Sequence, residues 1–117
     1  TDVRRRWQAG DPVVVEAMRT WAGYAEQGRT ALIQGDRNAL NYLINANFDL
    51  RARIYRLDDG NLQMIHRARE VGASSNFAGS GGAIAGLYAD EKMFESLVRV
   101  MTSIQVAVVK PVPAASV

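Results

Sequence analysis

The sequence contains no cysteine and a single histidine, His66. The lack of cysteine excludes disulfides, thiolate metal sites and a cysteine nucleophile, and it favours a reducing compartment such as the cytoplasm. One histidine excludes histidine-rich metal sites and disfavours a Ser-His-Asp triad. We interpret His66 as a surface or structurally bonded residue, and we expect no metal site.

The chain also has little net charge and no long apolar run. It carries 14 Lys and Arg against 12 Asp and Glu, a formal net charge of +2. This small excess does not indicate a nucleic-acid partner, whose only support is Arg4-Arg5-Arg6 beside Trp7, a pattern more typical of a solvated segment. Apolar runs such as residues 83–89 fall far short of the roughly 20 residues of a membrane span. We therefore expect neither a membrane segment nor a signal peptide.

The 117 residues, 48% of them hydrophobic, suit one globular domain spanning residues 1–117. The chain begins at Thr1 without an initiator methionine, and its first residues already have the composition of a domain interior. We expect it to be a piece of a longer protein, either a single domain or a processed fragment.

Four helices are predicted. Asp11-Pro12 is typical of a helix start, and apolar residues then recur at three-to-four spacing to residue 34, where Gly35 is expected to end the helix. Asp36 begins a second predicted helix over residues 37–57, followed by a short one over 62–71 and a last one capped by Asp90. Residues 2–10 are expected to be coil, from which one or two strands could still come. The side chains expected in the core include Val14, Ala17, Met18, Trp21, Tyr24, Ala25, Leu32, Leu40, Leu43, Leu50, Ile54, Leu57, Met93, Phe94, Leu97, Val98, Met101 and Ile104.

Residues 72–88 have a different character, because they contain five of the ten glycines. We predict a hairpin of two strands joined by a tight glycine turn at residues 79–82. A further β-branched strand is predicted over residues 105–109, and Pro111 and Pro113 close the domain. Helices packed on one face of a small, mostly antiparallel sheet define the α+β class with two layers.

Two segments are candidates for a site. In the turn, Gly79, Ser80, Gly81 and Gly82 could present bare backbone N–H groups and a hydroxyl to a phosphate, although a glycine hairpin without any ligand fits equally well. The turn is neither a P-loop nor a dinucleotide fingerprint, because the lysine and the following helix are missing. In the second helix, Asn47 occupies an apolar position. It is either a buried amide bonded to backbone or part of a polar pocket, and nearby Asp49 and Arg51 otherwise form a solvated face.

The glycine segment resembles the third, C-terminal motif of the GHMP small-molecule kinases. Several upstream segments are similar to the glucuronokinase-like branch, so that the resemblance extends to about residue 109. The matching segments are Arg4-Arg5-Arg6-Trp7, Gly10-Asp11, residues 26–32, residues 47–51, Gly72-Ala73, Phe77 and residues 79–83.

This resemblance implies a ferredoxin-like C-terminal domain that acts with an N-terminal ATP-binding domain, in cis or as a separate chain. It implies transfer of the γ-phosphate of ATP, with Mg²⁺, to a sugar hydroxyl, with glucuronate giving glucuronate 1-phosphate. Gly79, Ser80, Gly81 and Gly82 would lie near the nucleotide phosphates, and Asn47, Asp49 and Arg51 would lie on the sugar side. The chain alone is then expected to be inactive.

Two positions depart from the family motif: Asn76 stands where lysine is common, and Ala78 where threonine or serine is common. Both departures remove a group that could engage phosphate. A stand-alone, non-catalytic module that binds a small metabolite or a protein partner is the alternative. If the chain is a separated half, a homodimer is one way to cover the apolar surface that would normally face the missing half.

Overall fold

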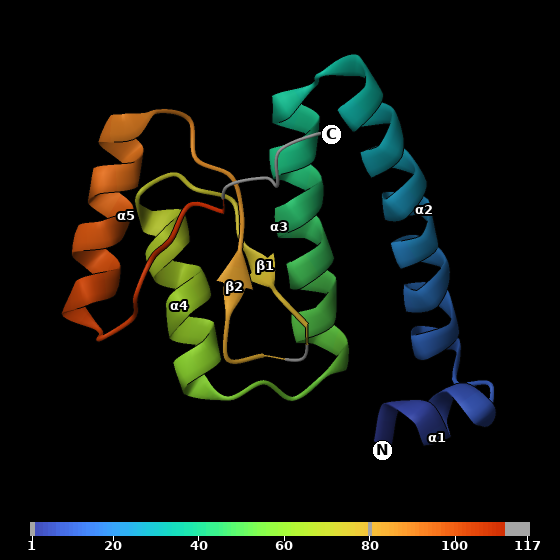
Figure 1. Cartoon of the computed structure of the whole chain (residues 1–117). Coiled ribbons are helices and arrows are strands. Elements are labelled where there is room, and N and C mark those ends of the chain that lie inside the picture. Colours follow the sequence, from blue (N-terminus) through green and yellow to red (C-terminus); the bar gives the residue numbers. More distant parts are fainter. Residues whose placement is uncertain (1, 80, 112–117) are drawn as a thin grey trace, which may run out of the picture.

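Two long antiparallel helices form one side of the molecule (Figure 1), as seen in a computed structural model that describes residues 2–79 and 81–111. They are α2 (Pro12–Gln34) and α3 (Arg37–Ile54). Both begin as predicted, because the carboxylates of Asp11 and Asp36 accept hydrogen bonds from the first free N–H groups of the two helices. Gly35, with φ of 65°, ends α2 in the left-handed conformation that glycine allows, so that the chain can reverse.

The first residues form a helix, α1 (Asp2–Gln8), where we expected coil or strand. Asp2 in its first turn bonds Arg5 at 2.9 Å, an arrangement of charge that suits the helix dipole. Val3 is buried against the α2–α3 pair, in one cluster with Leu50. The expectation of a strand here was wrong because a single apolar residue, rather than an alternating pattern, attaches this segment to the core.

The other side of the molecule consists of α4 (Asp59–Glu70), a β-hairpin and α5 (Glu91–Ser103). The hairpin strands, β1 (Asn76–Phe77) and β2 (Ile84–Ala85), are antiparallel, and the first residue of each pairs with the last of the other. Figure 1 shows the hairpin between α3 and α4, with α5 outside α4. The α+β class with a small antiparallel sheet is therefore confirmed.

Three small apolar clusters hold these layers together. One joins α1, α2 and α3, the second joins α3, α4 and β1, and the third joins α4 and α5. Over the described ranges, no helix is both long and apolar enough to cross a membrane. The buried members of the clusters are Val3, Val14, Ala17, Leu50 and Ile54; Phe48, Ile65 and Phe77; and Ala68, Ala73 and Met101.

The boundary between the second and third predicted helices is wrong by three residues on each side. Helix α3 ends at Ile54, because Tyr55 is extended, and α4 already begins at Asp59. Asp58 is the reason for the early start, since its carboxylate accepts from the Asn61 amide as an N-cap. Residues 59–61, which the sequence places between the two predicted helices, thus belong to the first turn of α4.

The strand predicted over residues 105–109 is absent, and Gln105 at its start has a left-handed φ of 62°. Val106 and Val108 alternate inward and pack on the α4–α5 cluster, and Lys110 bonds Glu91 at 2.6 Å beyond them. Within residues 2–79 and 81–111 no neighbouring strand pairs with this segment, so that its alternating pattern is satisfied by packing alone. Three expected core residues are also exposed: Ala25, Leu32 at 69% and Val98 at 39%. Pro113 lies outside the described residues.

Asp11 makes the fold sensitive to acid. Its carboxylate accepts from Arg6 Nε at 2.8 Å and from the Val13 amide at 3.0 Å, and these two bonds, the arginine first, lower the pKa of Asp11. The ionised form therefore stabilises the fold above the ordinary aspartate pKa of about 3.9, and this contribution is lost as pH falls through the lower folded value.

We expect Asp11→Asn, which keeps a good N-cap, to lower the Tm at pH 7 and to have a shrinking effect below about pH 4. Circular dichroism melts between pH 7 and pH 3 measure this difference. Asp36→Asn is the matched control, because Asp36 caps α3 and forms no ion pair within the described part of the chain. A Tm difference for Asp11→Asn that stays constant with pH would contradict the assignment.

Candidate functional site

The glycine turn lies at one end of the hairpin, in the conformation expected from its sequence. The Ala78 amide donates to the Ala83 carbonyl at 3.0 Å and closes the turn. Gly79, Gly81 and Gly82 have φ of 91°, 136° and 82°, values that side-chain-bearing residues rarely adopt. These three glycines are therefore required by the shape of the turn itself, whether or not a ligand binds there.

Two helices hold the turn from opposite sides. Arg51 Nη1 of α3 donates to the Gly79 carbonyl at 2.9 Å, and the Gly82 amide donates to Asn61 Oδ1 of α4 at 3.0 Å. Asn61 is itself fixed, because its backbone amide and its Nδ2 both donate to the Asp58 carboxylate at 2.8 Å. The turn is thus preorganised by side chains from distant parts of the sequence.

Part of the turn remains open to a ligand. The Gly82 amide is used internally, but no described residue accepts from the amides of Gly79 or Gly81. Gly79 is solvent-exposed. A Cβ on Gly81 would lie 2.9 Å from Asn61 Nδ2, which leaves no room for a side chain. Ser80, the fourth predicted member of the site, lies outside the described residues.

The three residues expected on the sugar side do not come together. Asn47 and Arg51 are one helical turn apart and both face the hairpin, where Asn47 Oδ1 accepts from Asn76 Nδ2 at 3.0 Å and Arg51 bonds the glycine turn. Asp49 lies on another face of α3 and pairs with Arg69 of α4 at 2.7 Å. Asn47 and Asp49 are therefore engaged in tertiary contacts, and Arg51 lies at the turn.

Asn76 and Ala78, the two departures from the family motif, place no charge at the turn. The Asn76 side chain bonds Asn47 and also accepts from the Phe77 amide at 2.8 Å, so it points toward α3. Ala78 is exposed and offers only a methyl group. The guanidinium of Arg51 is the cation that the structure brings to the turn instead.

Sequence reasoning missed Asn61. A signal was present, because Asp58 and Asn61 have the N-cap and N3 spacing of a capping box, which places both side chains at the start of one helix. That spacing predicts a helix start at residue 59, but it does not predict that Asn61 Oδ1 would reach residue 82. The second contact depends on how the hairpin packs on α4.

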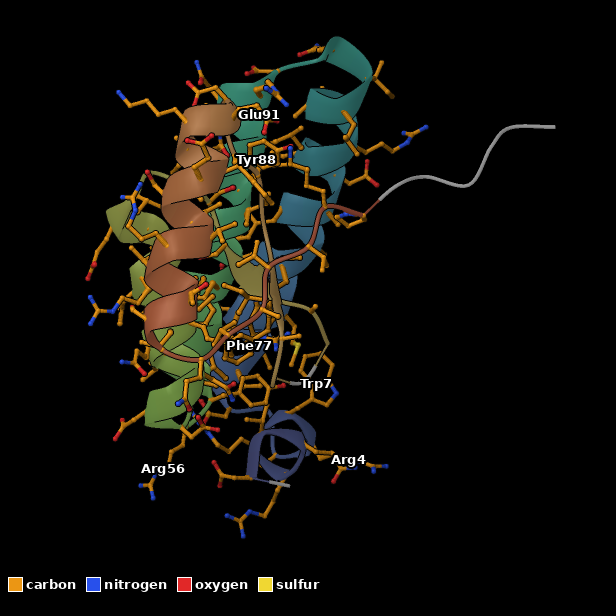
Figure 2. All side chains as sticks on the ribbon, turned by 60° about the vertical axis from the view of Figure 1, so that its left-hand side comes forward. Arg4, Trp7, Arg56, Phe77, Tyr88 and Glu91 are labelled. Atoms are coloured by element: carbon orange, nitrogen blue, oxygen red, sulfur yellow. The ribbon has the colours of Figure 1, made fainter. Side chains whose placement is uncertain are left out.

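Further basic and aromatic side chains surround this end of the molecule. Figure 2 shows Arg4, Trp7 and Arg56 at the end that carries the glycine turn, whereas Tyr88 and Glu91 lie near the opposite end. Arg4 and Arg56 are exposed, and Trp7 is 48% exposed. Exposed basic groups attract anions and raise their local concentration, so this end suits a negatively charged ligand.

Comparisons with known proteins agree with this geometry. The chain is 45% identical over 85 residues to glucuronokinase 1 and to probable glucuronokinase 2, both of Arabidopsis thaliana, an alignment that includes 70% of this chain. It spans about a quarter of the length of these relatives, 24% and 23%. In structure it matches a crystal structure of L. major mevalonate kinase in complex with R-mevalonate, with a TM-score of 0.74 and 24% identity, over 87% of this chain and 32% of that one. No family model matches.

The fold therefore matches part of a small-molecule kinase, the mevalonate kinase of L. major. Within that class the sequence is similar to glucuronokinases, and the resemblance predicted from the glycine motif and its upstream segments is confirmed.

Proposed function

We propose that this chain is the C-terminal half of an ATP-dependent sugar kinase that converts glucuronate to glucuronate 1-phosphate. The observation that carries the proposal is the 45% identity to two glucuronokinases over 85 residues. The glycine turn adds a physical reason, because no described residue accepts from the amides of Gly79 and Gly81 and neither glycine has a side chain that would keep an anion away.

In the proposed reaction a sugar hydroxyl oxygen attacks the γ-phosphorus of ATP. A new P–O bond to the sugar forms, the bond to the bridging β–γ oxygen breaks, ADP leaves, and the hydroxyl proton passes to a base. Positioning and neutralisation of charge dominate such transfers. The amides of Gly79 and Gly81 can contribute both, whereas we assign the base to the N-terminal domain.

The turn has donors for the phosphates of ATP but no set of ligands for Mg²⁺ among its described residues. Phosphate oxygens suit N–H donors, and the described turn has two such donors without an acceptor. Magnesium prefers oxygen ligands, and the described ranges contain no group of three or more His, Asp or Glu side chains that could hold a metal. We therefore propose that Mg²⁺ arrives with the nucleotide and neutralises its phosphates.

The proposed partner is an N-terminal kinase domain, in cis or as a separate chain, which completes a cleft over the turn. Exposed apolar side chains on both sides of the α2–α3 reversal, at the end of α3 away from Arg51, are candidates for the homodimer expected from the sequence. They are Leu32, Ile33 and Tyr42, exposed by 69%, 74% and 65%.

Kinase activity can be measured on the polypeptide encoded by the complete reading frame, incubated with ATP, Mg²⁺ and glucuronate. We expect ADP release coupled to a new anomeric phosphate signal in ³¹P NMR, and no turnover by residues 1–117 alone. Glucose is the matched control acceptor, because it differs only in a hydroxymethyl group in place of the carboxylate. Failure of the complete protein to phosphorylate any sugar or sugar acid would leave the non-catalytic binding module as the better proposal.

A further inference from the structure

Arg51 is held in an unusual environment for a half-exposed arginine. Its Nη1 donates to the Gly79 carbonyl, and its guanidinium carbon lies 5.4 Å from the centre of the Phe77 ring. Its Nε is buried, with no hydrogen-bond partner among the described residues. The ring and the carbonyl together fix the plane of the guanidinium at the edge of the turn.

No carboxylate of the described residues pairs with this guanidinium. Other arginines do have ionic partners; Arg6, for example, bonds Asp11 at 2.8 Å and Arg69 bonds Asp49 at 2.7 Å. Within residues 2–79 and 81–111, Arg51 has no ion pair and its Nη2 has no acceptor. The Asp58 carboxylate accepts from Asn61. Arg51 thus keeps a full positive charge and free N–H groups.

The free donors of Arg51 lie next to the free donors of the turn. The Gly79 carbonyl is the direct link, because Arg51 bonds it while the amides of Gly79 and Gly81 remain without acceptors in the described part of the chain. A guanidinium beside backbone amides that lack an acceptor can bind a tetrahedral oxyanion strongly, since every bond is made to the charged anion. A neutral sugar would gain much less from this set of donors.

We propose that Arg51 binds a terminal phosphate of the nucleotide, together with the amides of Gly79 and Gly81, and does not bind the sugar acid. Asn61 is a positioning residue, which fixes the turn through the Gly82 amide and touches no ligand. This inference rests on the proposed function for the identity of the anion as a nucleotide phosphate. The binding step itself requires no turnover.

The test is a titration of the 117-residue chain with inorganic pyrophosphate, followed by ¹⁵N NMR of the turn amides and of the arginine side chains. We expect shifts at Gly79, Gly81 and Arg51, with a Kd that rises with salt. Arg51→Gln should weaken binding at least about tenfold, and Arg51→Lys should weaken it less and preserve the salt dependence. Arg53→Gln is the matched control on the same helix, because Arg53 is exposed and makes no contact with the turn.

The Asn61→Ala variant tests whether Asn61 only positions the glycine turn or also contacts the anion. It should weaken pyrophosphate binding a few-fold through loosening of the turn, while the salt dependence stays that of the wild type. Melting temperatures of all variants identify any general loss of structure.

Three outcomes would overturn the proposal: no binding of pyrophosphate up to roughly 10 mM, equal affinity in Arg51→Gln and wild type, or an Arg51-dependent shift with glucuronate in place of pyrophosphate. The last outcome would return Arg51 to the sugar side without affecting the kinase proposal. Conversely, a complete protein without kinase activity would leave Arg51-dependent binding of pyrophosphate intact.

Discussion

Gly86→Ala is expected to destabilise the protein by more than about 4 kcal/mol, because the new methyl group has no room. A Cβ at position 86 would lie 1.7 Å from the Ser74 carbonyl oxygen and 3.1 Å from the Ser75 Cα, which are backbone atoms that cannot rotate away. Two hydrogen bonds hold Ser74 and Leu87 together beside this contact. The Ser74 amide donates to the Leu87 carbonyl at 3.2 Å, and the Leu87 amide donates to Ser74 Oγ at 3.1 Å. The alanine can be accommodated only if this end of the hairpin separates.

Urea unfolding followed by circular dichroism measures this loss. Since small domains have a total stability of about 5–15 kcal/mol, we expect a large shift of the midpoint or an unfolded protein in buffer. Gly28→Ala is the matched control, because a Cβ there meets nothing within 4 Å and alanine should stabilise the helix by up to about 1 kcal/mol. A midpoint for Gly86→Ala close to that of the wild type would show that the hairpin does not pack as described.

The second large effect is expected for Phe48→Ala, at about 3–5 kcal/mol of lost stability. Phe48 is 2% exposed and is central to the cluster that joins α3, α4 and β1. Its ring packs on Phe77 in an edge-to-face arrangement, with 5.1 Å between the ring centres. The guanidinium carbon of Arg69 lies over the ring, 5.4 Å from its centre. Alanine would leave a cavity beneath the strand that leads into the glycine turn.

Tyr42→Ala is the control for this variant, because Tyr42 is on the same helix and 65% exposed, so a change within about 0.5 kcal/mol is expected. NMR of the turn amides provides a second measurement, since Phe77 directly precedes the turn region and also supports Arg51. We expect Phe48→Ala to broaden the Gly79 and Gly81 signals. Equal stability of the Phe48 and Tyr42 variants would contradict the assignment of the core.

The candidate site was only partly predictable. The glycine turn could be predicted because glycine tolerates positive φ values that other residues rarely adopt. Three glycines of the turn have such values in the structure. Arg51 was placed on the sugar side, whereas the structure brings it to the turn. Helical periodicity relates Arg51 to Asn47, but it does not say which neighbour that face meets, and this decides what the guanidinium can bind.

The amino-acid sequence alone determined the features that depend on neighbours along the chain. Helix starts at Asp11, Asp36 and Asp90, the reversal at Gly35 and the hairpin at residues 76–85 all follow from hydrogen bonds and dihedral preferences within a few residues. Tertiary structure decided the features that need a distant partner. Helix α1 is attached to the fold by Val3, which packs in the core between α2 and α3. Residues 105–109 form no strand, because no strand in the described part of the chain lies beside them to pair with. The positive charge at the glycine turn has the same origin, since it comes from a helix 28 residues away in the chain.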